Sequence, residues 1–256
     1  MANFSFHRFV SVARFFFPRL KLQIIWYPII SLILGMATMA CMLSQSPGLF
    51  FLALTGDTFI LSILLEYGPL AFAFYSSPEM ETSLPATNTE KITFIFGYTF
   101  IAIPIMLLAP VTLIELMWND KFFTPTMTEI LKNINSAVGS LSCKNIIMSL
   151  FQYLFPMAVC LYAVMKHTSK RLAKGIIWTV CANVSLAVIG VLIGAGKAFV
   201  EGYNDAMTGK EPRPDEITHE VLSDMGTFID WGGAILAICS IFVIYKTYRA
   251  ITSRQL

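Results

Sequence analysis

Six long apolar stretches, separated by shorter polar segments, constrain this chain more than any other feature of its sequence. A helix needs about 20 apolar residues to cross a hydrocarbon core that is about 30 Å thick. We therefore predict an all-α, polytopic membrane protein with six transmembrane helices. The expected spans are Gln23–Leu43, Leu49–Tyr75, Ile92–Trp118, Ile146–Met165, Gly175–Phe199 and Phe228–Tyr245.

The composition leaves little room for a soluble domain. Of the 256 residues, 56% are hydrophobic and 13% are charged, whereas soluble domains carry about 25% charged residues. The net charge of +2 is too small to indicate a nucleic-acid partner. We expect one transmembrane domain over residues 1–256, with an interfacial helix at 1–21, a cytoplasmic loop at 76–91, and outer loops at 119–145 and 200–227.

Lysine and arginine are concentrated in alternate loops. With six spans, twelve of the 18 Lys and Arg residues fall on the same side of the membrane. Cytoplasmic loops carry such an excess, so both termini are expected in the cytoplasm. The residues concerned lie in 8–21, at Lys91, in 166–174 and in 246–254.

The segment Phe4–Phe17 has the pattern of an amphipathic helix. Arg8 and Arg14 fall outside its apolar stripe. The stripe consists of aromatic and aliphatic side chains at helical spacing: Phe6, Phe9, Val10, Ala13, Phe16 and Phe17. Such a helix is expected to lie in the membrane interface. Two interpretations stay open: an anchor with no further duty, and a lever that links the movement of a cytoplasmic partner to the first span.

The cytoplasmic loop Ser76–Lys91 carries two helix-start signals. Ser77, Pro78 and Glu79 form the first, with a cap, a proline in the first turn and an acid near the positive end of the helix dipole. The second is a Thr-x-x-Glu capping box at Thr87 and Glu90, which opens the third span. We expect a short acidic helix held between two spans, with an ordinary capped turn as the alternative.

Both outer loops also carry helix-start signals. Thr126 and Glu129 form a second capping box, and an amphipathic pattern follows it. The segment Pro214–Met225 begins with proline and two acids and has apolar residues on one side. We expect a structural amphipathic helix in the first loop and a small external cap in the second.

Four carboxylates fall within or near the expected spans. A carboxylate in the membrane costs about 2.5–3.5 kcal/mol, so it usually faces protein or a water-filled path. Glu66 is expected to be the deepest and to be either hydrogen-bonded within the bundle or part of a proton relay. Because the three His residues lie outside the spans, neither a metal site nor a catalytic group is expected. The carboxylates are Asp57, Glu66, Glu115 and Asp230, and the histidines are His7, His167 and His219.

Small residues in the fifth span indicate a close helix contact. Gly190 and Gly194 form a GxxxG pattern, which lets two helix backbones approach each other. That contact is expected within one chain or across a dimer seam. The stretch Gly194–Lys197 does not form a phosphate-binding loop, since Val191 replaces the first glycine and Ala198 follows the lysine. Any ATP used must therefore be hydrolysed by another chain.

Taken together, these features resemble the membrane permease subunit of an ABC transporter of the type-2 exporter class. The segment Leu84–Lys91 also looks like an "LPAS/T…EK" element of small bacterial permeases of this class. The resemblance implies a multi-pass protein of the bacterial cytoplasmic (inner) membrane that is not itself an enzyme. It has no cofactor of its own, because ATP and Mg²⁺ bind to partner ATPase subunits.

The same resemblance implies a second permease chain, as a homodimer or heterodimer, and a coupling role for the loop 76–91. The exported substrate would be amphipathic or lipidic. The coupling residues would be Glu79, Met80, Glu81, Leu84, Pro85 and Glu90. Two other functions stay open: an ion- or proton-coupled carrier that uses Glu66 and Asp57, and a membrane assembly factor without transport.

Overall fold

The structure of the chain is a computed structural model that describes residues 4–43, 47–75, 86–118, 143–208 and 235–253. These ranges contain helices and no strand, which confirms the all-α prediction for this part of the chain. The elements are α1 (Phe6–Leu43), α2 (Pro47–Tyr67), the 3₁₀ helix η1 (Gly68–Leu70), α3 (Ala71–Tyr75), α5 (Asn88–Gly97), the π-helix η2 (Tyr98–Ala102), α6 (Ile103–Trp118), α8 (Cys143–Lys166), α9 (Arg171–Thr208) and a last helix, Ile235–Thr252.

Five helical segments of the described residues are long and apolar enough to cross a membrane. They are Phe6–Cys41, Gly56–Phe74, Asn88–Val111, Arg171–Ile189 and Ile235–Thr252. By length and composition the chain is therefore a multi-pass helical membrane protein. The expected fourth span, Ile146–Met165, coincides with helix α8 but is not one of the five. Six spans and cytoplasmic termini stay predictions.

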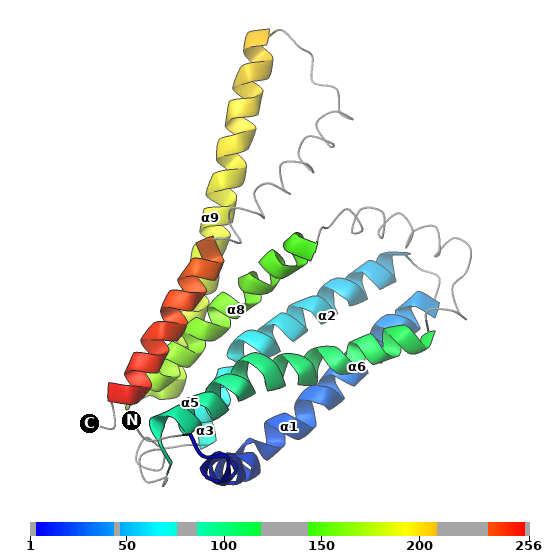
Figure 1. The fold of residues 1–256 in the computed structure, drawn as a ribbon. Coiled ribbons are helices and arrows are strands. Elements are labelled where there is room, and N and C mark those ends of the chain that lie inside the picture. The colour runs from blue at the N-terminus through cyan, green and yellow to red at the C-terminus, as the bar shows by residue number, and fades with distance from the viewer. Residues whose placement is uncertain (1–3, 44–46, 76–85, 119–142, 209–234, 254–256) are drawn as a thin grey trace.

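Three of the expected segments are not the separate, regular α-helices that the sequence predicts. The interfacial helix and the first span are one helix, α1, which contains Pro18 and Pro28. Figure 1 shows the first turns of α1 nearly end-on, whereas the rest runs beside α2 and α6, so the helix bends. Proline is the usual cause of such a bend, because its ring removes a backbone hydrogen bond. The second span is interrupted by η1 at Pro69, and the third contains the π-helical turn η2.

The last two helices extend beyond their expected bounds. Helix α9 covers Arg171–Thr208 and therefore exceeds the span Gly175–Phe199 at both ends. The last helix is described over Ile235–Thr252, so it continues past the expected end at Tyr245 and through Lys246 and Arg249. The apolar pattern marks the part of a helix that suits lipid, whereas the backbone hydrogen bonds continue into polar sequence.

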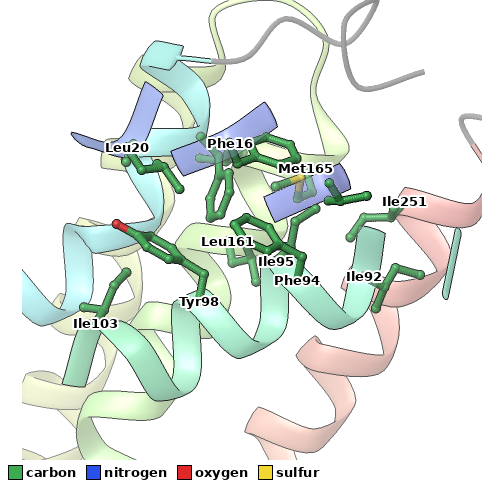
Figure 2. Close-up of a cluster of buried hydrophobic side chains, with 14 of the residues drawn as sticks. Phe16, Leu20, Ile92, Phe94, Ile95, Tyr98, Ile103, Leu161, Met165 and Ile251 are labelled. Carbon is green, nitrogen blue, oxygen red and sulfur yellow. The ribbon is translucent and has the colours of Figure 1, made fainter. Parts of the chain in front are cut away.

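The hydrophobic core lies at one end of the bundle, which we call the junction end. Here α1 and α5 begin, while α8 and the last helix end. Val12, Ile92, Met165 and Ile251 come from these four helices and belong to one buried cluster. Figure 2 shows Ile251 beside Ile92, with Phe16 and Phe94 close together. The basic segments that the charge pattern assigns to one side of the membrane therefore lie at the same end of the molecule.

The part of α9 that follows Asn183, residues 184–208, is called the upper part of α9 and differs from the junction end. In Figure 1 it leads away from α1, α2 and α6. Val184, Val188 and Val191 on this helix are 55%, 50% and 70% exposed. In a bilayer an apolar surface of this kind is suited to lipid or to another transmembrane helix.

Candidate functional site

The carboxylate of Glu90 connects the start of α1 to the start of α5. Its Oε1 accepts hydrogen bonds from the backbone N–H of Ser5 at 2.8 Å and from Nε of Arg8 at 3.0 Å. Its Oε2 accepts from the backbone N–H of Thr87 at 2.6 Å and from the Thr87 hydroxyl at 2.5 Å. The predicted capping box of Thr87 and Glu90 is confirmed, and its acid also binds a segment more than 80 residues away. We call these four residues the Glu90 junction.

Glu90 is the fully buried member of the Glu90 junction. The Glu90 side chain is 0% exposed, whereas that of Arg8 is 39% exposed. A buried carboxylate is tolerated when its oxygens are hydrogen-bonded and its charge is paired, and both conditions are met here. Glu90 therefore faces the interior, where it fixes the position of the residues that surround it.

Aromatic side chains pack directly beside the Glu90 junction. Phe94, one helical turn after Glu90, stacks on Phe16 with ring centroids 5.2 Å apart and contacts Phe9 and Phe17 at 6.3 and 6.1 Å. Tyr98 continues the row at 6.2 Å from Phe94. Offset and edge-on aromatic pairs at these distances are favourable beyond their buried area. The bent start of α1 and helix α5 are thus held together by both polar and aromatic contacts.

Only part of the expected apolar stripe of the first helix is buried. Val12, Phe16 and Leu20 are at most 2% exposed and face the core. Phe6 and Phe17 are 72% and 51% exposed. The buried face is therefore rotated from the face expected from the sequence, since packing against α5 selects which aromatic residues turn inward.

A row of polar side chains follows the inner face of α1 into the membrane region. Gln23 donates to the Gly68 carbonyl at 3.0 Å and accepts from the Tyr98 hydroxyl at 2.9 Å. Tyr27 donates to the Leu64 carbonyl at 3.1 Å. Further along, Ser31 donates to the carbonyl of Leu107, and Thr38 donates to the carboxylate of Asp57. These bonds join α1 to α2, η1 and α6.

The carboxylate of Glu66 is paired within the bundle. It is 8% exposed and accepts a hydrogen bond of 2.5 Å from the side-chain amide of Asn183 on α9. Asp57 lies about two and a half turns earlier on the same helix and bonds to Thr38 on α1. The two carboxylates thus contact different helices.

The turn between α8 and α9 also belongs to the junction end. Lys170 has a φ of 52°, and the guanidinium Nε of Arg171 donates to the Val164 carbonyl at 2.9 Å. Arg171 is 6% exposed, so one of the cations that the charge pattern counts as a loop charge closes the end of α8. A Cβ on Gly175 would lie 2.5 Å from Leu70 Cδ2, which shows how closely α9 approaches η1.

The predicted site residues are distributed over described and undescribed parts of the chain. Glu90, Glu66 and Asp57 are placed as above. The coupling residues Glu79, Met80, Glu81, Leu84 and Pro85 lie outside the described residues, as do Asp230 and both expected outer-loop helices. Gly190 and Gly194 lie in α9, and Glu115 lies in α6, but the contacts of these three side-chain positions are not described.

Sequence reasoning missed the polar residues that bond α1 and α9 to neighbouring helices. Gln23, Tyr27, Ser31 and Thr38 recur at helical spacing, which is the signal that could have revealed them. Asn183 lies in an apolar span in which the polar residues do not form a comparable row. Among the described residues, His, Cys, Asp and Glu do not gather into a group that could hold a metal ion.

The long apolar helices define a class, the multi-pass helical membrane proteins. No family model, no curated protein and no solved structure matches this chain.

Proposed function

We propose that the chain is the permease subunit of an ATP-driven exporter of the ABC type-2 class. The single observation that carries this proposal is the Glu90 junction. It connects the N-terminal amphipathic helix to Glu90, one of the last residues of the expected coupling loop. A force applied to that loop would reach α1 and α5 together, because both helices bind the same buried carboxylate.

The aromatic contacts extend this connection toward the membrane region. Phe94 and Tyr98 lie one and two turns beyond Glu90 and pack against α1 and α3. Tyr98 then donates to Gln23, which itself donates to the carbonyl of Gly68. Movement at the cytoplasmic loop would therefore change the relative positions of α1, α2 and α6, as alternating access requires. This arrangement favours the lever interpretation of the N-terminal helix over a plain anchor.

Under this proposal, the other components of the transporter are partner chains. Two ATPase subunits bind ATP and Mg²⁺ and grip the loop 76–91 from the cytoplasm of a bacterial cell. A second permease chain completes the path, with Gly190 and Gly194 at a helix contact. The substrate is amphipathic or lipidic.

The experiment isolates the tagged full chain in mild detergent from cells that make it naturally. We expect an ATPase subunit with Walker motifs to co-purify, and its ATPase rate to rise on reconstitution with the chain. Charge reversal at Glu79 and Glu81 should remove this stimulation while the chain stays in the membrane. Reversal of Asp215 and Glu216, two neighbouring acids of the expected outer loop, is the matched control.

An ion- or proton-coupled carrier is the second candidate. The observation that favours it is the buried Glu66 carboxylate, which bonds to Asn183 between α2 and α9. An intact complex without an ATPase would overturn the exporter and leave this carrier or a non-transporting assembly factor. Unchanged stimulation in the Glu79 and Glu81 variant would overturn the coupling role of the loop.

A further inference from the structure

An apolar groove runs between α1 and the continuous helical segment formed by α5, η2 and α6. Its volume is about 230 Å³, and its lining includes Phe9, Phe17, Ile24, Phe94, Gly97 and Met106. An apolar cavity of about 150 Å³ is large enough to bind benzene, so this groove can hold a longer hydrocarbon segment. Because Phe17 is 51% exposed, the groove is open to the surroundings of the bundle.

No side chain or backbone of the described residues fills the space beside Gly97. A Cβ on Gly97 would meet no atom within 4 Å, whereas a Cβ on Gly35 or Gly68 would come within 3 Å of a neighbouring side chain. The backbone of Gly97 has φ −59° and ψ −43°, which every residue type adopts in a helix. Glycine costs about 1 kcal/mol relative to alanine within a helix. Neither the backbone nor a neighbour requires glycine here, and its effect is to leave the groove open.

The groove also includes an irregular part of the backbone. The π-helical turn η2 begins directly after Gly97 and contributes Tyr98 and Ala102 to the lining. Single π-helical turns are rare and are frequently found at functional sites. The Tyr98 hydroxyl is bonded to Gln23, so it does not require a polar group in the groove.

Basic side chains follow the groove along α1. Arg14, Phe17, Lys21 and Ile24 are spaced by three, four and three residues, which places them on one face of a helix. Lys21 thus lies between two lining residues, and Arg14 lies one turn before Phe17. Both cations are exposed. An apolar groove beside two exposed cations is complementary to an acyl chain that carries an anionic headgroup.

We propose that this groove binds an anionic glycerophospholipid. One acyl chain occupies the groove at Gly97, and the phosphate lies against Lys21 and Arg14. The proposal needs only the membrane setting and does not depend on the exporter function. The bound lipid would lie against Phe94, which is part of the aromatic contact beside the Glu90 junction.

The test uses the full chain, purified in detergent and depleted of lipid, with phosphatidylglycerol or phosphatidylcholine added before native mass spectrometry. We expect retained phosphatidylglycerol in preference to phosphatidylcholine. Gly97→Leu should lose this lipid and keep its thermal stability, since the new side chain fills open space. Lys21→Gln and Arg14→Gln should each weaken phosphatidylglycerol retention about fivefold and leave phosphatidylcholine unchanged.

Gly56→Leu is the matched control, because a Cβ on Gly56 also meets no atom within 4 Å. This variant should retain the lipid as the unmodified chain does. Equal retention of the two lipids, or unchanged retention by Gly97→Leu, would overturn the proposal. Loss of phosphatidylglycerol in Gly97→Leu together with unchanged ATPase stimulation would support the lipid site and separate it from the exporter proposal.

Discussion

The junction end and the upper part of α9 are both rich in apolar residues, but they differ in what surrounds them. Phe16 and Phe94 at the junction end are 2% and 6% exposed, whereas Val184 and Val188 on α9 are at least 50% exposed. The first pair is enclosed by protein and lies beside the Arg8–Glu90 ion pair, in which the Glu90 carboxylate is fully buried. The second pair is free to contact lipid or another chain.

This difference shows that apolar sequence alone does not tell which residues hold the fold together. In a membrane, lipid is as apolar as leucine, so exposure of a valine costs little. Polar contacts and aromatic packing then decide which apolar residues are enclosed by protein, as they are at the junction end.

Among the variants considered, truncation of Phe94 at the junction end should lower the free energy of unfolding most. Phe94→Ala removes contacts with Phe9, Phe16, Phe17 and Tyr98. We expect a loss of about 3–5 kcal/mol in the free energy of unfolding, measured by SDS titration in mixed micelles with circular dichroism. Val188→Ala on α9 is the control and should change it by less than about 0.5 kcal/mol. Equal losses in the two variants would abolish the distinction between the regions.

Substitution of the buried acid should have an intermediate effect. Glu90→Gln keeps the shape of the side chain, but its amide nitrogen cannot accept the hydrogen bonds that one carboxylate oxygen accepts. Since buried donors lose a partner, we expect a loss of about 1–3 kcal/mol in the free energy of unfolding, in the same titration. Thr89→Ala, at an exposed neighbouring position, is the control. A Glu90→Gln chain as stable as this control would show that aromatic packing alone holds α1 on α5.

The smallest effect is expected between α2 and α9. Asn183→Leu removes the hydrogen bond to Glu66 and keeps a side chain of similar size. Hydrogen bonds between transmembrane helices contribute about 0.6 kcal/mol on average, so the free energy of unfolding should fall by about that amount. Ser185→Ala is the comparison, because the Ser185 hydroxyl donates to the Cys181 carbonyl of its own helix. A loss above about 2 kcal/mol would place Glu66 among the main determinants of the fold.

Local patterns in the sequence predicted some of these features and could not predict others. The capping box at Thr87 and Glu90 follows from residues three positions apart, so it was predictable. The bond from Arg8 to Glu90 joins residues 82 positions apart, and no local pattern contains it. Gln23 and Ser31 lie in a stretch whose average hydropathy is high, so the hydropathy pattern indicates only a span there.

The irregularities within the expected spans have a similar explanation. Hydropathy measures how well a stretch suits lipid, but it is insensitive to the backbone path through it. The 3₁₀ turn at Gly68–Leu70 and the π turn at Tyr98–Ala102 leave the apolar pattern intact. The candidate coupling residues Glu79 and Glu81 lie outside the described residues, so their role rests on the sequence.

The π turn at Tyr98–Ala102 sets the rotational phase between the two halves of its helix. One residue is added there relative to an α-helix, and each residue corresponds to a rotation of about 100°. Before the turn, Phe94 faces the start of α1. After the turn, the Leu107 carbonyl accepts a hydrogen bond from Ser31, which also belongs to α1. If this turn became regular α-helix, either α5 or α6 would rotate away from its contact with α1. The additional residue therefore lets the continuous helix of α5, η2 and α6 follow the bent helix α1 on both sides of the turn.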